Sequence, residues 1–226
     1  MLLIEAEQIC RSFVAGKSSI PALSPISLKI YSGEFLVVTG PSGAGKSTLL
    51  NLLSCLDRPS CGEVSFMGQS FSRMAEQKIA LLRNSSFGFI FQMPHLLMDR
   101  TVLENVALPF HYGLPVSRVV VQERCRALLE YVGLAEMESR YPNTLSGGEM
   151  QRVVFARALC REPEVIFADE PTGSLDTENS RKILALLKDQ TTQARAVIMV
   201  THDQEPVNFA TRIIQLDKIS MDTSLV

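Results

Sequence analysis

Apolar and polar residues alternate in the first part of the chain, and this pattern predicts β-strands. "LLIEAEQICRSF" (2–13) and "ISLKIYSGEFLVVTG" (26–40) both show the alternation, with Gly33 at a turn. "GEVSFMG" (62–68) predicts a further short strand between two glycines. The chain is therefore expected to begin with a β-rich part.

Helical spacing of apolar residues follows. "KSTLLNLLSCL" (46–56) predicts a helix that ends at Asp57-Arg58-Pro59, and the stretch 94–159 is helical in pattern. Within it, "VVVQERCRALLEYVGL" (119–134) places Gly133 where a C-cap glycine would stand. "DTENSRKILALLKDQ" (176–190) predicts a helix with an apolar face and with Asp176 as its N-cap.

Two apolar runs end in polar or acidic residues. "EVIFADE" (164–170) and "AVIMVTHD" (196–203) are typical of buried parallel strands that carry chemistry at their C-terminal ends. The order strand, helix, strand predicts an α/β core with a helical insertion.

Composition narrows the class of protein. The 226 residues suit one large domain, 46% are hydrophobic, and the net charge of −2 gives no overall basic footprint for nucleic acid. Five scattered cysteines without a CxxC pair favour a reducing compartment and argue against a disulfide framework or a zinc site. The start has no basic signal region, and apolar runs of about five residues are far shorter than a membrane helix. We expect a soluble protein whose membrane role, if it has one, comes through a partner.

The stretch "TGPSGAGKST" (39–48) follows the apolar run 35–38 and fits G-x-x-x-x-G-K-[ST]. The glycines let several backbone N–H groups point into one hollow, and a helix that starts near Lys46 adds partial positive charge. Such a hollow suits a polyphosphate. Lys46 would reach the outer phosphates, and the Ser47 hydroxyl would ligate Mg²⁺.

Two acids stand at the end of the run 164–170. A carboxylate at the end of a buried strand beside a phosphate loop would hold Mg²⁺, which gives this role to Asp169. Hydrolysis also needs a group that orients or deprotonates water, and Glu170 can point toward the γ-phosphate.

"LSGGEMQR" (145–152) predicts a second anion site. Ser146, Gly147 and Gly148 can open a helix whose free N–H groups and serine hydroxyl face an anion. One chain then has two phosphate-binding helix starts about 100 residues apart.

Over nearly its whole length the sequence resembles the ATP-binding-cassette (ABC) ATPases. The resemblance rests on several motifs in the family's order: "GPSGAGKST" as Walker A, Gln92 in "GFIFQ" as the Q-loop, "LSGGE" as the signature, "VIFADE" as Walker B, "GSLD" (173–176) as the D-loop and His202 in "VTHD" as the switch histidine. It implies a P-loop NTPase (RecA-like) core with an N-terminal antiparallel β-subdomain, over 1–92 and 161–226, and an inserted α-helical subdomain over 93–160.

The resemblance implies ATP and Mg²⁺ as ligands and assigns roles to residues. Ser47 and Gln92 contact Mg²⁺ with Asp169 behind it, Glu170 activates water, and Lys46 and His202 contact phosphate. The implied Walker A contacts are Gly40, Pro41, Ser42, Gly43, Ala44, Gly45, Lys46, Ser47 and Thr48, with Thr48 near the α-phosphate. Ser146, Gly147, Gly148 and Asp176 complete the nucleotide site.

Phe13 stands where the family places an aromatic residue that stacks on adenine, and any ring face suffices for stacking. The alternative is a core position in the β-subdomain.

The family implies a head-to-tail dimer, in which Walker A of one subunit faces Ser146 to Gly148 of the other, as a homodimer or with a paired cassette. "LRNSSFGFIFQMPHLLMDRTVLENVALP", "ADEPTGSLD" and "LSGGE" are similar to the lipoprotein-releasing (LolD-like) and macrolide-exporter (MacB-like) group. That group implies a separate integral membrane subunit and a location on the cytoplasmic face of the inner membrane. Alternatives are a non-transport ATPase of the cell-division type, an importer, and a soluble ABC protein of translation or DNA repair.

The segment 93–110 follows the Q-loop glutamine. Met93, Leu96, Leu97 and Met98 cluster around Pro94, which interrupts any ordinary helix. They predict an adaptable apolar docking site for the membrane subunit, with local core packing as the alternative.

Overall fold

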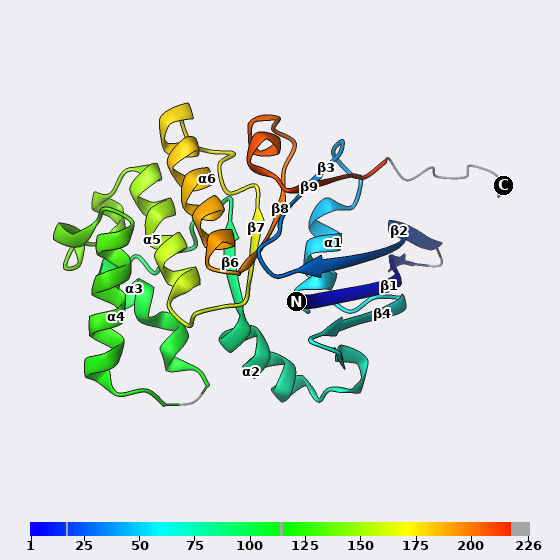
Figure 1. The fold of residues 1–226 in the computed structure, drawn as a ribbon, viewed down its shortest axis with the longest axis horizontal. Coiled ribbons are helices and arrows are strands. Elements are labelled where there is room, and N and C mark those ends of the chain that lie inside the picture. The colour runs from blue at the N-terminus through cyan, green and yellow to red at the C-terminus, as the bar shows by residue number, and fades with distance from the viewer. Residues whose placement is uncertain (17, 114, 218–226) are drawn as a thin grey trace.

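The computed structural model describes residues 1–16, 18–113 and 115–217. Two sheets form its framework (Figure 1). An antiparallel sheet has the strand order β2-β1-β4-β5, and a parallel sheet has the order β6-β7-β8-β3-β9. The strands are β1 (Leu2–Ala15), β2 (Ser18–Tyr31), β3 (Phe35–Thr39), β4 (Cys61–Phe66), β5 (Gln69–Ser70), β6 (Phe87–Phe91), β7 (Val165–Asp169), β8 (Ala196–Val200) and β9 (Arg212–Gln215).

Helices pack on both faces of the parallel sheet. Helices α3, α4, α5 and α6 pack on one face, and α1 packs on the other face, in a core shared with the antiparallel sheet. Figure 1 shows α3, α4 and α5 grouped at the end of the molecule opposite the antiparallel sheet, with α6 beside β7 and β8. The helices are α1 (Lys46–Leu53), α2 (Glu76–Ser86), α3 (Val102–Ala107), α4 (Arg118–Tyr131), α5 (Gly147–Leu159) and α6 (Thr177–Thr192). Among the described residues, no helix is long and apolar enough to cross a membrane.

The central parallel strands β3, β7 and β8 are buried on both faces, which explains their continuous apolar runs, whereas the edge strand β9 is partly exposed. On β3, Leu36 and Val38 pack into a core shared with α1 and the antiparallel sheet. Phe35 and Val37 pack into a second core with α3, α4, α5 and α6. Successive side chains point to opposite faces, so one short strand joins the two cores.

The α/β architecture, with its antiparallel β-part and its group of helices, is confirmed. Asp176 caps α6 by accepting a hydrogen bond from Asn179 N at 2.8 Å, and Ile183, Leu184 and Leu187 are buried, as the pattern predicts. Gly133, with φ 72°, follows α4 as its C-terminal glycine. The subdomain bounds 93–160 stay a prediction.

Two expectations need correction. The first predicted helix ends at Leu53 instead of Leu56, because Cys55 adopts a left-handed conformation (φ 57°) and Leu56 N donates to Asn51 O at 2.9 Å, which closes the helix. The second concerns the cysteines, whose scattered pattern argued against a disulfide framework, although one pair is bonded. Cys10 and Cys61 are direct partners in the β1–β4 register, with Cα atoms 5.2 Å apart, and they form a disulfide.

Candidate nucleotide site

The phosphate loop lies between β3 and α1. Gly45 has φ 91°, and a Cβ at this position would collide with the Ala22 carbonyl oxygen, so only glycine fits. The helix then begins at Lys46, whose side chain is 9% exposed. Its Nζ donates to Gly40 O at 2.8 Å and to Pro41 O at 3.1 Å, so the ammonium lies over the hollow of the loop. The helix start and the lysine together have the geometry and charge that suit an anion.

Ser47 and Asp169 meet beside this loop. Ser47 stands in the first turn of α1 and Asp169 ends β7, and the Ser47 hydroxyl donates to Asp169 Oδ1 at 3.2 Å. Burial raises the pKa of Asp169, and the hydrogen bond from Ser47 opposes this rise. Two hard oxygen donors, a hydroxyl and a carboxylate, therefore face the same space.

Glu170 and His202 form the next pair. Glu170 follows β7 with φ 46°, a conformation that non-glycine residues rarely adopt and that recurs at functional sites. Its amide donates to Val200 O at 3.0 Å, so the neighbouring strand holds the strained backbone. His202 Nδ1 lies 2.8 Å from the carboxylate, and this hydrogen bond and the negative charge raise the pKa of His202.

Gln92 lies next to Glu170. It follows β6, and the register places Phe91 opposite Asp169 on β7. A Cβ added to Gly173 would lie 2.9 Å from Gln92 Nε2 and 3.4 Å from Glu170 Oε2, so the two side chains approach the same point. The Q-loop and Walker B residues are therefore neighbours.

The signature residues form a separate helix start. Ser146 caps α5, because its hydroxyl accepts from Glu149 N at 3.3 Å, while Glu149 accepts from Ser146 N at 2.7 Å. Gly148 lies so close to Asn179 that a Cβ would collide with its side chain. Asn179 also donates to Asp176, which links the signature to the D-loop.

The two helix starts are not joined within one chain. Among the residues that the structure describes, no hydrogen bond or ion pair connects Ser146, Gly147 or Gly148 with the loop 40–48. In the loop itself, Pro41, Ser42 and Gly43 are exposed, Ala44 is buried, and Thr48 is half-buried.

Phe13 lies on β1 with 46% of its surface exposed, so it is not a core residue of the antiparallel sheet. The Arg11 guanidinium carbon lies 4.8 Å from the centre of its ring, a cation–π contact. Arg11 is held in turn by Asp57, with Nη2 donating to Oδ1 at 2.9 Å. Among the described residues, no hydrogen bond, ion pair or aromatic contact joins the Phe13 side chain to the phosphate loop.

Sequence reasoning missed Arg11 and Asn179. Arg11 stands two residues before Phe13, on the same face of the strand, and this spacing could have pointed to it. Asn179 gave no such signal, because its contact with Gly148 depends on how α5 and α6 pack.

The comparisons with known proteins agree with this geometry. The family model described as "ABC transporter" matches residues 23–173. The chain belongs to the ABC transporter family. It is an ABC ATPase that serves as an ATP-binding subunit.

Two similar proteins align with 95% of this chain. The chain is 44% identical to an uncharacterized ABC transporter ATP-binding protein of Methanocaldococcus jannaschii, with 95% of each chain covered. It is 44% identical to the macrolide export ATP-binding/permease protein MacB of Chlorobaculum tepidum, and this alignment covers 95% of the chain and 33% of MacB. The chain thus spans about a third of the MacB relatives.

A solved structure shares the fold. The dimeric structure of the bacterial ABC transporter cassette MJ0796 superposes with a TM-score of 0.88 and 38% identity, covering 96% of this chain and 95% of that one. A dimeric post-hydrolysis state of the same cassette, bound to ADP and Pi, gives 0.87 and 37% over the same shares.

Proposed function

We propose that this ABC ATPase hydrolyses ATP with Lys46 on the outer phosphates, Glu170 as the base for the attacking water, and His202 on the γ-phosphate. The observation that carries the proposal is the convergence of these three residues at one edge of the parallel sheet. They come from the start of α1, the residue after β7 and the segment after β8. A protonated His202 can stabilise charge on the phosphate, since its pKa is raised.

The residues beside the loop fit Mg²⁺. Ser47 and Asp169 offer two hard oxygen donors in hydrogen-bond contact, and Gln92 can add an amide oxygen. Few protein ligands are expected, because magnesium at a nucleotide site keeps water and phosphate as its other ligands. When bound, Mg²⁺ would neutralise phosphate charge. Thr48 and the amides of 40–45 would hold the remaining phosphate oxygens.

Glu170→Gln tests the catalytic assignment. The amide keeps the shape and loses the basicity, so ATP binding is expected to persist while phosphate release falls by orders of magnitude. Phosphate release is measured with the purified chain and with any membrane subunit that co-purifies. Near-wild-type turnover would remove Glu170 from its role.

The second half of the site is proposed to come from another cassette. Ser146, Gly147 and Gly148 lie apart from the chain's own phosphate loop, and the relative MJ0796 is described as dimeric. A head-to-tail dimer, of this chain or with a paired cassette, would bring each signature to the other's ATP. Phe13 would stack on the adenine ring.

We further propose that an apolar surface of Met93, Leu97 and Met98 docks an integral membrane subunit. These side chains are 66%, 43% and 58% exposed, whereas Leu96 is buried, so only one of the four predicted docking residues packs in the core. A groove with a volume of about 370 Å³ between β6, α2 and α5 includes Phe91 and Arg157 in its lining. Arg157 donates to Pro94 O at 3.0 Å and to His95 O at 2.9 Å, which ties this segment to α5.

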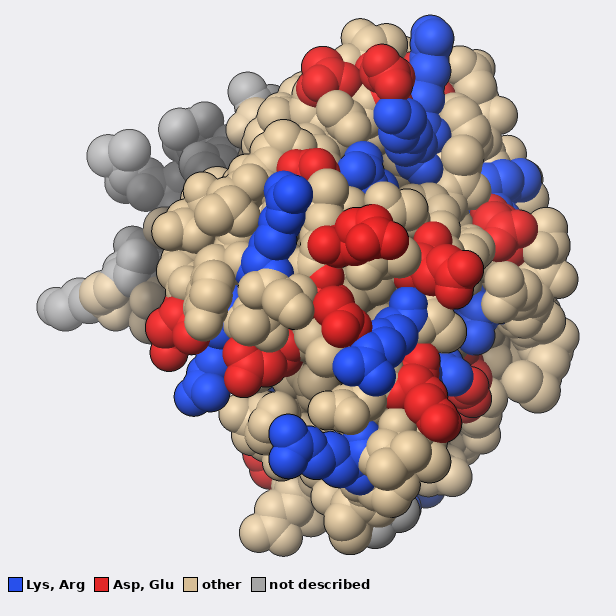
Figure 2. All heavy atoms as spheres, turned by 90° about the vertical axis from the view of Figure 1, so that its left-hand side faces the viewer, with Lys and Arg blue, Asp and Glu red and all other residues tan. Residues whose placement is uncertain are grey.

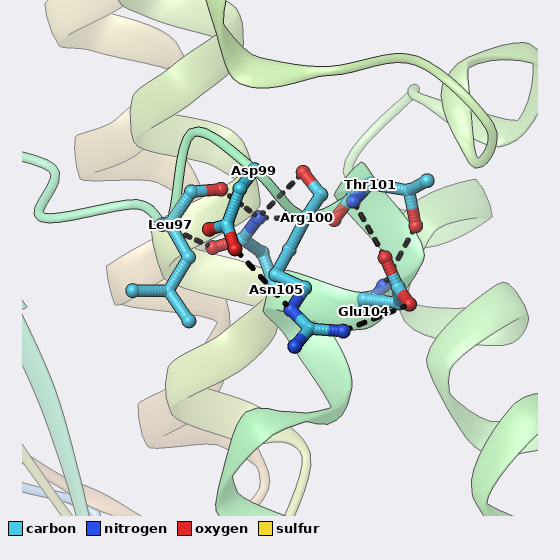
Figure 3. A network of polar contacts seen from close by, with 6 residues as sticks. All are labelled: Leu97, Asp99, Arg100, Thr101, Glu104 and Asn105. Atoms are coloured by element: carbon cyan, nitrogen blue, oxygen red, sulfur yellow. Dashed lines mark hydrogen bonds and ion pairs between the residues drawn. The ribbon is translucent and has the colours of Figure 1, made fainter.

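The docking segment is fixed by a buried asparagine. Asn105, 0% exposed, accepts from Leu97 N at 2.8 Å and donates to the carbonyls of Leu97, Arg100 and Thr101 at 3.0, 3.2 and 2.9 Å (Figure 3). Thr101 and Glu104 form the capping box of α3 in the same network. Exposed apolar side chains on an ordered loop suit a partner surface.

Leu97→Asp tests docking. Since Leu97 is half-exposed, we expect unchanged melting and ATP binding, with loss of co-purification with the membrane subunit. Leu56→Asp is the matched control, because Leu56 is similarly exposed (45%) and lies just after α1, outside the docking segment. A Leu97→Asp chain that melts early yet still co-purifies would contradict the docking role.

The lipoprotein-release or macrolide-export type is supported by 44% identity to MacB of Chlorobaculum tepidum. The corresponding location is the cytoplasmic face of the inner membrane, reached through the membrane subunit. The face formed by the α3–α5 group carries acidic and basic side chains side by side (Figure 2). Co-purification with a membrane subunit, followed by its identification, tests both proposals.

A further inference from the structure

Gln151 is the buried polar residue closest in sequence to the signature. It lies in the second turn of α5, five residues after Ser146, and its side chain is 1% exposed. Burying an amide costs free energy unless its hydrogen bonds are made. Its Nε2 donates to Phe91 O and to Pro171 O, each at 2.9 Å. Both N–H groups of the amide are therefore used.

The two acceptors flank proposed functional residues. Phe91 ends β6 and precedes Gln92, while Pro171 follows Glu170. Glu170 has the strained φ of 46°, and Val200 O holds its amide from the β8 side. Gln151 holds the backbone from the opposite side, through the carbonyl of the next residue. The backbone beside Gln92 and the backbone beside Glu170 are thus both hydrogen-bonded to one glutamine of α5.

From this geometry we propose that Gln151 is a positioning residue that fixes Gln92 and Glu170 relative to the signature helix. The inference rests on the proposed roles of those two residues. Ser146 and Gln151 belong to one continuous helix, so a shift of its start on meeting a phosphate would move both carbonyl contacts. In the proposed dimer, the α5 start faces the ATP of the partner cassette, while Gln92 and Glu170 act on the ATP bound to their own chain. These two parts would then move together.

Gln151→Met tests the proposal, because methionine has a similar length and no N–H donors. The buried Pro171 carbonyl and the part-buried Phe91 carbonyl lose their Gln151 donor, which lowers the melting temperature. Displacement of Glu170 should also lower kcat roughly 10-fold or more, with KM for ATP nearly unchanged, since Lys46 and its loop are untouched. Hydrogen exchange at residues 92–93 and 170–173 should rise.

Gln190→Met is the matched control. Gln190 is also 1% exposed, and its Nε2 donates to Tyr131 Oη at 2.9 Å, far along α6 from the site. It should lower the melting temperature without changing kcat or the exchange at residues 92–93 and 170–173. If Gln151→Met changes only stability, as Gln190→Met does, the positioning role is wrong.

Two further variants keep the outcome decisive. If Gln151→Met does not fold, Gln151→Asn retains an amide that is one methylene too short for both carbonyls, and the same loss of kcat is expected. Wild-type kcat in folded Gln151→Asn would overturn the proposal. If Glu170→Gln keeps wild-type turnover, the proposed function fails. If Glu170→Gln is inactive but Gln151→Met keeps full kcat, only the role of Gln151 fails.

Discussion

The starts of α1 and α5 are the two proposed anion sites, and they are built differently. At α1, a glycine with positive φ is followed by Lys46, and the Ser47 hydroxyl meets Asp169 from a neighbouring strand. At α5, Ser146 is capped by the carboxylate of Glu149, and no lysine stands nearby in the first turn. The first site gathers positive charge and the proposed magnesium ligands from its own chain. The second offers N–H groups and one hydroxyl, with Arg140 and Arg152 near enough to help lower the pKa of Glu149. Without a lysine at the helix start, it suits a phosphate already held by another subunit.

Removing Lys46 should have the largest effect. Lys46→Ala takes away the ammonium that lies over the loop, so ATP binding should weaken and hydrolysis should fall by roughly 100-fold or more. Phosphate release and ATP titration measure the two effects. Lys182→Ala is the control, because Lys182 is an exposed lysine paired with Glu178 on α6. Equal losses in both variants would contradict a specific role for Lys46.

The sequence predicted local features of this structure better than contacts between residues far apart in the chain. Asp176 and the apolar face of α6 were readable because a cap and a helical face are local features. Helix α2 was not predicted, since Ile79 is its only buried residue among Glu76–Ser86 and its pattern is mostly polar. The Cys10–Cys61 bridge depends on β1–β4 register across 51 residues, which no local pattern reveals.

The same distinction applies to the site. Strand-end residues such as Asp169 and Glu170 were predicted, because an apolar run that ends in acids identifies them. Gln151 and Asn179 were not, because their partners lie on elements that meet only after α5 packs against β6 and α6. Tertiary packing, rather than local pattern, decides those contacts.

Blocking the α5 start should have the next largest effect. Ser146→Arg places a long side chain where the partner's phosphate would lie, so the ATP-dependent dimer should be lost while ATP binding persists. Size-exclusion chromatography of Glu170→Gln with Mg-ATP shows the dimer, and the double variant should run as a monomer.

Ser117→Arg is the control for Ser146→Arg. Ser117 caps α4 by accepting from Val120 N, so it changes a helix cap outside the proposed interface. It should leave the dimer intact. Equal dimerisation of the Ser146→Arg double variant would show that the signature does not face the partner's nucleotide.

Removing the aromatic ring proposed to stack on adenine should have a smaller effect. Phe13→Ala should weaken ATP binding roughly 10-fold, as expected for the loss of one stacked base, and should leave tripolyphosphate binding unchanged. Calorimetry with both ligands measures this. Phe110→Ala is the matched control, because Phe110 also lies under an arginine, Arg161, at 5.1 Å. Unchanged ATP affinity in Phe13→Ala would return Phe13 to a structural role.

The smallest effect is expected from the carboxylate that distinguishes the α5 start. The backbone N–H and hydroxyl of Ser146 lower the pKa of Glu149, so it is ionised at neutral pH. Its negative charge would oppose an incoming phosphate, and it holds the Ser146 hydroxyl at 2.8 Å. Glu149→Gln keeps an oxygen that can cap Ser146 N and removes the charge.

In the Glu170→Gln background, Glu149→Gln should therefore lower the ATP concentration for half-maximal dimerisation by about threefold, with little change in melting, since a surface charge interaction is modest. The difference should shrink at 1 M salt, where the Debye length is about 3 Å. Because folding lowers the pKa of Glu149, the ionised carboxylate contributes stability that is fully present above its unfolded-state pKa and disappears as the pH falls through its folded-state pKa. Plots of melting temperature against pH for wild type and Glu149→Gln should therefore stay parallel between about pH 6 and 8 and converge in acid. Weaker dimerisation in Glu149→Gln would show that the carboxylate assists the phosphate contact by orienting Ser146, and the α5 start would then be a built site in its own right.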